Sequence, residues 1–487
     1  MSHKKELVKN TVIIAIGKIS TQILSYILLP LYTAKMAVSE YGTFDLVITL
    51  SLFLCPVITM LMEESMFRFL IDAVGLKEKK KVISQTLFFS VIGCLIFIPL
   101  AIIVLNIATN YTASFNVAFI IFVLSNVIIN LSNAFARGLS QIKLYSISNF
   151  ILGITTIIFT IIVIFFKPNA EGLMYANSIA NILTGGFIFY KLGIFKYIEK
   201  PDKEKTKDML RYSIPLVPNS ISWSIINMSD RIILTSMVNS EVNGIYAMAN
   251  KFPNIIVVLY SYFYTAWKES AAKILKEDNK EKFYNNIYHD VKKFIFSVTL
   301  CLTAVMPFAF PIFINKAYEA AYIYIPLCTI AMYYSTLSSF YGGIFSAYKD
   351  TKIMGYTTFI AAAINLVVDL LLVKKFEIFA ACFSTLLADL IVYYYRRYKL
   401  KDYLKLKELK LLGPITMFVL VCLAYYTKFI PGIPMALYWI LNVITLILSI
   451  LYSIAINKTI LLSLIQKIKL LGKRGKIGKR KVAKDEN

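Results

Sequence analysis

The chain has 487 residues, of which 58% are hydrophobic and only 16% charged, and a soluble domain could not bury so large an apolar fraction. Its net charge of +24 comes from 52 lysines and arginines gathered between apolar runs, which indicates an anionic membrane surface and argues against a nucleic-acid partner. No phosphate loop, HExxH or GxSxG motif occurs, so nothing in the sequence favours a hydrolase.

Fourteen apolar runs are predicted to be transmembrane helices, because each is close to the roughly 20 residues needed to cross about 30 Å of hydrocarbon. In chain order they are residues 11–34, 43–70, 83–105, 113–136, 144–166, 172–193, 210–237, 244–267, 291–314, 321–347, 352–373, 376–395, 409–428 and 434–456. The first run is long for a signal peptide and lacks a small-residue cleavage site, so we expect it to be retained. The sequence predicts an all-α polytopic membrane protein.

The basic residues predict the orientation of these helices. Of the 52 lysines and arginines, 42 lie in or beside the termini and the loops on one side, six lie on the other side, and four lie within spans. By the positive-inside rule, both termini are expected in the cytoplasm. The most basic block, residues 467–484, is then expected to lie along the anionic inner leaflet.

A short segment occurs twice. MAVSEYGTF at residues 36–44 is matched by MVNSEVNGIY at 237–246, and two further matches follow at similar offsets, Ser90-Val91 with Ser297-Val298 and Phe135-x-x-Gly138 with Phe340-x-x-Gly343. Each match lies six predicted helices after its counterpart. The halves would therefore enter the membrane in the same direction, as in transporters built from parallel repeats that move substrate by alternating access.

This repeat divides the chain. We predict a first six-helix repeat at residues 1–200, a second at 201–400, two extra transmembrane helices at 401–460 and a basic cytoplasmic tail at 461–487. The glycine of the repeated segment is expected to serve a tight turn or close packing, with a gate contact as the alternative.

Polar residues form related stripes on the first and seventh helices. Lys18 and Gln22 lie one turn apart, and Asn219, Asn227 and Arg231 follow one face of the seventh helix. A basic residue at mid-bilayer costs about 2.5–3.5 kcal/mol, so these side chains are expected to face a wet cavity or a carboxylate. We assign all five to a candidate substrate site.

Lys251 and Arg68 complete that candidate site. Lys251 precedes Phe252-Pro253, where a proline kink frees backbone carbonyls, and Arg68 could pair with Glu64 one turn earlier. Structural roles are the alternatives: snorkelling for Lys18, an ion pair for Arg231 and the proline kink for Lys251.

Three acidic residues are candidates for ion coupling, because an unpaired carboxyl within a membrane can take up a proton. They are Glu63, Asp369 and Asp389. The six cysteines occur singly in apolar runs and the two histidines in polar segments, so we expect no metal site and no cofactor.

The segments KNTVIIAIGKISTQILSYILLPLYTAKMAVSEYGTFDLV and NMSDRIILTSMVNSEVNGIYAMANKF resemble the openings of the two halves of polysaccharide and O-antigen (Wzx-type) flippases. These belong to the multidrug/oligosaccharidyl-lipid/polysaccharide exporter superfamily, and the resemblance extends over the whole fourteen-span plan. It implies translocation of undecaprenyl-diphosphate-linked oligosaccharides across the bacterial cytoplasmic membrane, driven by an ion gradient. It also implies a cationic cavity, which Lys18, Arg231 and Lys251 would line, with Arg68 at the cytoplasmic entrance.

Other functions remain as alternatives. A lipid II flippase and a multidrug/cation antiporter have the same expected architecture, although buried basic residues favour an anionic cargo over a cationic drug. A membrane enzyme would need a larger extramembrane segment than these loops offer, so we expect no catalytic activity. We expect a monomer that contacts membrane lipid, and the sequence leaves open whether it works beside polysaccharide polymerase machinery.

Overall fold

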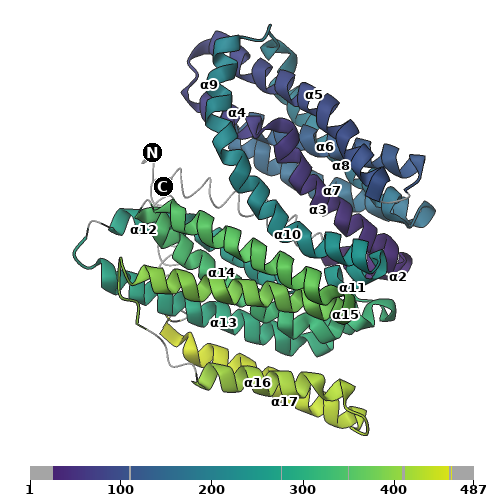
Figure 1. Ribbon diagram of the computed structural model, residues 1–487, viewed down its shortest axis with the longest axis vertical. Coiled ribbons are helices and arrows are strands. Elements are labelled where there is room, and N and C mark those ends of the chain that lie inside the picture. The colour runs from purple at the N-terminus through teal and green to yellow at the C-terminus, as the bar shows by residue number, and fades with distance from the viewer. Residues whose placement is uncertain are drawn as a thin grey trace, which may run out of the picture. The chain divides into compact units, whose positions relative to one another are not determined.

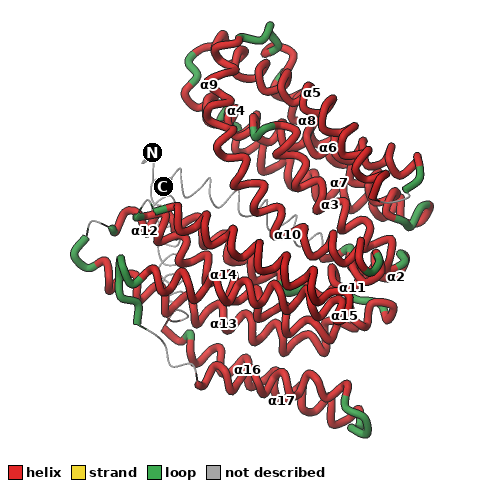
Figure 2. Tube along the Cα trace, viewed as in Figure 1, coloured by secondary structure: helices red, strands yellow, loops and turns green. Residues whose placement is uncertain are grey.

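The computed structural model describes residues 26–108, 111–275, 277–348, 350–407, 412–459 and 462. In this part of the chain the regular structure is entirely helical (Figure 2). Eight described helices are long and apolar enough to cross a membrane: Val38–Thr59, Gly75–Ile107, Ala113–Gly138, Ile142–Phe166, Lys280–Phe313, Lys316–Ala347, Lys352–Leu400 and Met435–Ile456. The all-α membrane class is confirmed, whereas the count of fourteen spans and the repeats stay predictions.

The helices are labelled in Figure 1. The α-helices are α2 (Leu29–Lys35), α3 (Val38–Thr59), α4 (Met62–Asp72), α5 (Gly75–Ala108), α6 (Ala113–Gly138), α7 (Ile142–Phe166), α8 (Ala170–Leu192), α9 (Lys203–Ser213), α10 (Val217–Met237), α11 (Ser240–Lys251), α12 (Asn254–Ile274), α13 (Lys280–Phe313), α14 (Ile325–Ala347), α15 (Thr351–Leu400), α16 (Leu412–Tyr426) and α17 (Met435–Ile456). Short 3-10 helices are η1 (Ile194–Tyr197), η2 (Ile214–Leu216), η3 (Lys316–Tyr324) and η4 (Thr427–Phe429).

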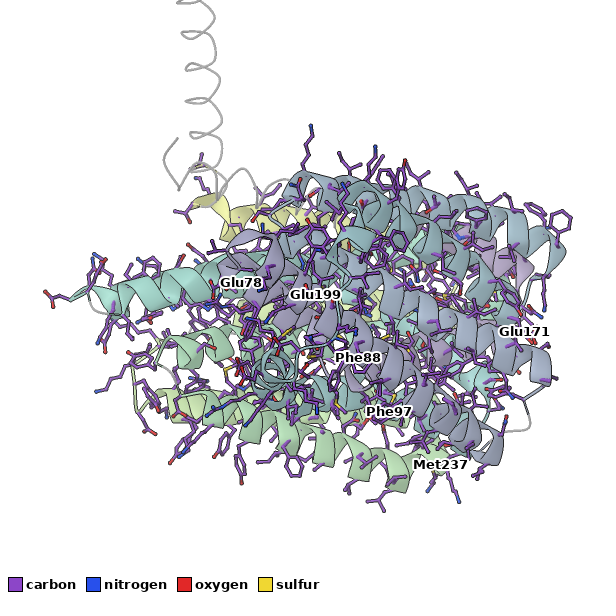
Figure 3. The ribbon with its side chains drawn as sticks, turned by 90° about the horizontal axis from the view of Figure 1, so that it is seen from above. Glu78, Phe88, Phe97, Glu171, Glu199 and Met237 are labelled. Atoms are coloured by element: carbon purple, nitrogen blue, oxygen red, sulfur yellow. The ribbon has the colours of Figure 1, made fainter. Side chains whose placement is uncertain are left out.

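The chain forms two compact units. Unit 1 comprises Met1–Ala249, Pro311–Tyr322 and Thr358–Ala388, and unit 2 comprises Asn250–Phe310, Ile323–Thr357 and Asp389–Asn487. In unit 1, α8 packs against α6 and α7, while α3 packs against α5, α6 and α10 (Figure 1). Figure 3 shows Glu78 and Glu199 toward one end of this unit, Glu171 toward the other, and Phe88 and Phe97 between them. Charge at the ends and apolar surface between them are what a membrane-spanning bundle requires.

Unit 2 has an aromatic core. Here α12 packs against α14, and α16 packs against α17. Trp267 of α12 stacks on Phe340 of α14 with ring centroids 4.5 Å apart, and its indole N–H donates to the Phe340 carbonyl at 3.1 Å. Aromatic rings bury large areas and an indole N–H needs an acceptor when buried, so this contact fixes α12 on α14.

The predicted span at residues 43–70 is wrong as one continuous helix. It is divided between α3 and α4 at Met60 and Leu61, which have positive φ angles of 49° and 52°. Pro56 lies one turn before this break and cannot donate to the Leu52 carbonyl. The Ser224 hydroxyl of α10 donates to that carbonyl at 3.4 Å instead.

Two other breaks occur in the predicted spans. The predicted span 244–267 is divided between α11 and α12 at the Phe252-Pro253 step, which is the position of the predicted proline kink. Within α15 the backbone leaves helical geometry at Glu377, where φ is 46° and ψ is −121°. This residue adjoins the predicted boundary between the spans 352–373 and 376–395.

The two copies of the repeated segment meet in unit 1. A Cβ added to Gly42 of α3 would lie 1.9 Å from the Ser240 carbonyl oxygen of α11, and one added to Gly244 would lie 2.2 Å from the Val38 oxygen. The Asn243 amide also donates to the Gly42 carbonyl at 2.8 Å. Both glycines are therefore required by backbone contact between α3 and α11, as is common where membrane helices cross closely.

A second matched pair of glycines occupies similar positions. A Cβ on Gly138 of α6 would lie 2.7 Å from the Leu70 side chain of α4, and one on Gly343 of α14 would lie 2.6 Å from the Trp267 ring of α12. In each unit the glycine accommodates a bulky side chain from another helix of that unit. This correspondence is what the predicted repeat would produce.

Candidate functional site

Part of the predicted substrate site lies outside the described residues. Lys18 and Gln22 fall in the N-terminal segment that is not described, and Asn219 and Asn227 lie on α10 with side chains that are not described. Lys251 is half-buried at the end of α11. Their roles in substrate binding stay predictions.

Arg68 does not pair with Glu64. Its guanidinium donates to Asp72 at 2.5 Å, one turn later on α4, and both side chains are exposed, while Glu64 lies 3.6 Å from Arg137 of α6. The i,i+4 spacing allowed either carboxylate. The neighbouring α6 helix supplies a cation for Glu64, which the local spacing could not indicate.

Arg231 has a carboxylate partner on another helix. Its Nε donates to Asp45 Oδ2 of α3 at 2.6 Å, and the two side chains are only 17% and 19% exposed. The guanidinium also lies over the Tyr246 ring at 5.8 Å. The expectation that Arg231 faces a carboxylate is met by Asp45, and the contact joins α10 to α3.

The neighbouring Asp230 points into a buried polar cluster of unit 1. Its carboxylate accepts hydrogen bonds from the Asn365 amide at 2.9 Å, from the Thr385 hydroxyl at 3.0 Å and from the Tyr246 hydroxyl. Ser229 donates to the Asn365 oxygen at 2.8 Å. The cluster thus joins α10 to two segments of α15, those before and after the Glu377 break.

Asp369 completes the cluster. Its Oδ1 accepts from the Ser384 hydroxyl at 2.6 Å, the side chain is fully buried, and its carboxyl interacts with that of Asp230. Among the described residues, Asp369 Oδ2 has no hydrogen-bond donor. Two carboxyls in one buried site cannot both remain ionised cheaply, so the site favours a bound proton or cation.

The composition of this Asp230–Asp369 cluster limits its chemistry. It offers two carboxyls with amide and hydroxyl oxygens, which are ligands for hard cations. Within the described residues no group of three His, Cys, Asp or Glu side chains is arranged to hold a metal ion. Such an oxygen donor set can accept a proton or a hard cation.

The other two predicted coupling residues lie elsewhere. Glu63 of α4 is 8% exposed, and its Oε2 has no hydrogen-bond partner among the described residues. Asp389 belongs to unit 2, where its charge interacts with that of Arg396. The hydrogen bonds given above for the Asp230–Asp369 cluster involve neither residue.

Sequence reasoning missed most of this cluster. Asp230, Asn365, Ser384 and Thr385 are not among the predicted site residues, although Asp230 adjoins Arg231 and Asn365 lies one helical turn before Asp369. Asp45, the partner of Arg231 outside this cluster, is not among them either. These local signals mark polar faces on each helix. They do not show that α10 and α15 meet, because that depends on tertiary packing.

Comparison with known proteins gives one family and one fold. The model of a family described as "Polysaccharide biosynthesis protein" matches residues 7–267. A search of curated proteins found no match.

Several solved structures share the architecture. One described as "Lipid II flippase MurJ, inward closed conformation" has a TM-score of 0.70 at 14% identity and covers 93% of this chain and 100% of its own. An inward-facing multidrug resistance MATE family transporter of the MOP superfamily has a TM-score of 0.64 at 13% identity. It covers 80% of this chain and 98% of its own. A MOP superfamily transporter from Pyrococcus furiosus has a TM-score of 0.53 at 13% identity. It covers 81% of this chain and 96% of its own.

Proposed function

The chain belongs to the polysaccharide biosynthesis protein family and has the fold of MOP superfamily transporters, and from this premise we propose a specific cargo. We propose that it is a flippase that moves undecaprenyl-diphosphate-linked oligosaccharide repeat units across the bacterial cytoplasmic membrane. The family match over residues 7–267 carries the proposal. Its direction is from the inner to the outer leaflet, both termini are cytoplasmic, and the protein acts as a monomer without enzymatic activity.

The substrate site proposed for this cargo contains Lys18, Gln22, Arg68, Asn219, Asn227, Arg231 and Lys251. In this proposal the basic members bind the diphosphate and the amides bind sugar hydroxyls. Arg231 keeps its Nε contact with Asp45, and a guanidinium with its five N–H donors can bind two anionic groups at once. The ion pair would then hold the guanidinium in position.

The Asp230–Asp369 cluster supports coupling to an ion gradient. Asp369 is a proposed coupling residue, together with Glu63 and Asp389. When a proton or monovalent cation leaves the cluster, two buried carboxylates repel each other and weaken the contacts between α10 and α15. An ion that binds one arrangement of these helices better than another shifts the balance between transporter states.

The cargo is tested in cells depleted of the protein. Lipids are extracted and analysed by mass spectrometry, and intermediates on each leaflet are distinguished by their accessibility to an added glycosidase in intact and permeabilised spheroplasts. We expect a complete oligosaccharide unit on the polyprenyl diphosphate to accumulate on the inner leaflet. Re-expression of the intact chain is the control and should clear it.

Other outcomes contradict this cargo. Accumulation of lipid II would assign the chain to that substrate. The likeness to the solved structure of a lipid II flippase supports this second candidate. If no polyprenyl intermediate accumulates and sensitivity to cationic drugs rises, a multidrug antiporter replaces the flippase. A polymerase partner is tested separately, by co-purification from cells with intact polysaccharide synthesis.

Ion coupling is tested with Asp369→Asn. Transport is measured in proteoliposomes with an imposed proton or sodium gradient. We expect the gradient-stimulated transport rate of this variant to be at least about tenfold lower, because removing one carboxyl removes the charge that the ion neutralises. The matched control is Asp208→Asn, which removes an exposed carboxyl from α9. A variant with unchanged dependence on both gradients would refute coupling through this cluster.

A further inference from the structure

Unit 2 contains a cavity that the proposed function does not use. It has a volume of about 250 Å³ and lies between α13, α14, the C-terminal part of α15 and the start of α16. Its thirteen lining residues are Lys292, Phe296, Thr299, Ile330, Tyr333, Tyr334, Tyr393, Tyr394, Arg397, Pro414, Ile415, Phe418 and Val419. All belong to unit 2.

The lining is basic at two positions and otherwise mostly aromatic or aliphatic. Lys292 and Arg397 are its charged members, and none of the thirteen is acidic. Lys292 is only 4% exposed, and its ammonium donates to the Tyr288 hydroxyl at 3.3 Å. A lining that places two basic side chains together and holds no acidic one favours an anion.

The opposite wall is apolar and accessible. Tyr394, Ile415 and Val419 line the cavity, yet 53%, 54% and 47% of their surfaces are exposed. In a membrane helix such exposed aliphatic and aromatic surface faces hydrocarbon. The cavity is therefore amphipathic, with buried positive charge on one side and a wall that lipid chains can reach on the other.

The basic residues lie on the charged side of the apolar stretches of their helices. Lys292 lies just before the apolar stretch of α13, and Arg397 is in the last turn of α15, which ends at Leu400. Pro414 is in the first turn of α16. The positive-inside pattern puts all three ends at the cytoplasmic face, where anionic lipids are concentrated.

We propose that this cavity binds an anionic phospholipid of the inner leaflet, with Lys292 and Arg397 on its phosphate and the aromatic walls around the first carbons of its chains. Basic pockets between membrane helices on this side suit phospholipid head groups. The volume is below the roughly 300–1,000 Å³ typical of pockets for drug-sized ligands. It suits a phosphate with its adjoining carbons and not an oligosaccharide. The lipid is a resident ligand, distinct from the proposed cargo.

Native mass spectrometry of the full-length detergent-solubilised protein tests the site. Dioleoyl phosphatidylglycerol and dioleoyl phosphatidylcholine are titrated separately, and the retained lipid is counted. We expect preferential retention of phosphatidylglycerol, reduced by about tenfold in the double variant Lys292→Gln/Arg397→Gln, because charge-assisted hydrogen bonds to the phosphate are lost. The control Lys293→Gln/Lys399→Gln removes equal charge from the same helices without touching the cavity lining and should retain the lipid.

A second variant keeps the test decisive if the double variant unfolds. Val419→Trp fills the accessible wall at a half-exposed position and leaves both basic residues in place, and it should also lower lipid retention. Equal losses in the site and control variants, equal retention of phosphatidylcholine, or unchanged binding in Val419→Trp would overturn the proposal. Full competition by inorganic phosphate at the lipid's own concentration would show a free-anion site instead. These measurements involve no transport, so their failure would leave the proposed flippase function untouched.

Discussion

The Arg231–Asp45 pair shows how a charge is accommodated within the apolar part of this protein. Each side chain is less than one-fifth exposed, and the two lie on α10 and α3, helices far apart in sequence. Burying two charges costs several kcal/mol, and their attraction offsets this cost only while both are present. Loss of one partner is therefore expected to destabilise the protein more than replacement of both.

A double-mutant cycle tests this role. We expect Arg231→Ala to destabilise the protein by about 3–5 kcal/mol, because Asp45 is left buried without its cation, and Arg231→Ala/Asp45→Ala to cost less. Equilibrium unfolding in detergent measures both. The exposed Arg68→Ala variant is the control and should change stability little. Normal stability with lost transport in Arg231→Ala would favour direct substrate contact over the structural pair.

Asp202 allows a prediction about pH outside the membrane-spanning segments. Its carboxylate accepts a hydrogen bond from Lys81 at 2.5 Å and caps α9 by accepting from the Glu204 and Lys205 amides, and the Lys81 contact is the main cause of its lowered pKa. A lowered folded-state pKa means that the pair adds stability above the unfolded pKa of about 3.9, and that this stability is lost as pH falls below it.

We therefore expect the wild-type unfolding temperature to fall more steeply between pH 5 and pH 3 than that of Asp202→Asn. The asparagine still caps the helix but has no charge to lose. Thermal unfolding of both proteins in one detergent gives the comparison. Parallel curves over this range would show that the Lys81–Asp202 pair contributes no pH-dependent stability.

Among the helices, the crossing of α3 and α11 restricts residue type on both of its sides. Gly42 and Gly244 each lie against backbone atoms of the other helix, so no side chain fits without separating them. The Asn243 amide bonded to the Gly42 carbonyl holds the same crossing. Because the two glycines occupy matching positions in the repeated segment, one sequence pattern supplies both sides of the contact.

Gly42→Ala should separate α3 from α11, since the new Cβ would lie 1.9 Å from a carbonyl oxygen that belongs to the backbone and cannot rotate away. We expect a loss of stability of about 1–3 kcal/mol from overpacking. Gly186→Ala on α8 is the matched control, because its Cβ would meet nothing within 4 Å. It should be neutral or stabilise the helix by up to about 1 kcal/mol. Similar stabilities in both variants would contradict the close crossing.

For the whole molecule, the distribution of basic residues determines the expected orientation. The 42 lysines and arginines on one side outnumber the six on the other, and such asymmetry is read during insertion and does not depend on details of packing. The proposed flipping direction and the proposed phospholipid cavity both use this orientation. A topological measurement therefore tests a premise that they share.

The membrane topology is measured with single cysteines introduced into a cysteine-free variant of the protein. We expect Lys203→Cys to react with a membrane-impermeant maleimide only after permeabilisation, and Lys316→Cys to react in intact cells. Both side chains are exposed, and the six native cysteines to be replaced lie within helices. Labelling of Lys203→Cys in intact cells would reverse the predicted topology.

The sequence by itself determined the membrane class and most helix positions, because both depend on apolar length and on breakers such as Pro253. It also identified Asp369 and Arg231 as polar residues that need a partner within the membrane. It did not identify the division at Met60 and Leu61, because Met and Leu rarely adopt the positive φ angles that both have there.

Only the tertiary structure decided which polar groups meet. Asp45 joins Arg231, and Asp230 joins Asn365 and Asp369, across sequence separations of more than 130 residues. The amphipathic cavity of unit 2 likewise needs four helical segments at once. Local sequence shows that a helix carries a polar face, but which faces are buried together depends on packing of the whole bundle, because a buried polar group is costly unless another helix supplies its partner.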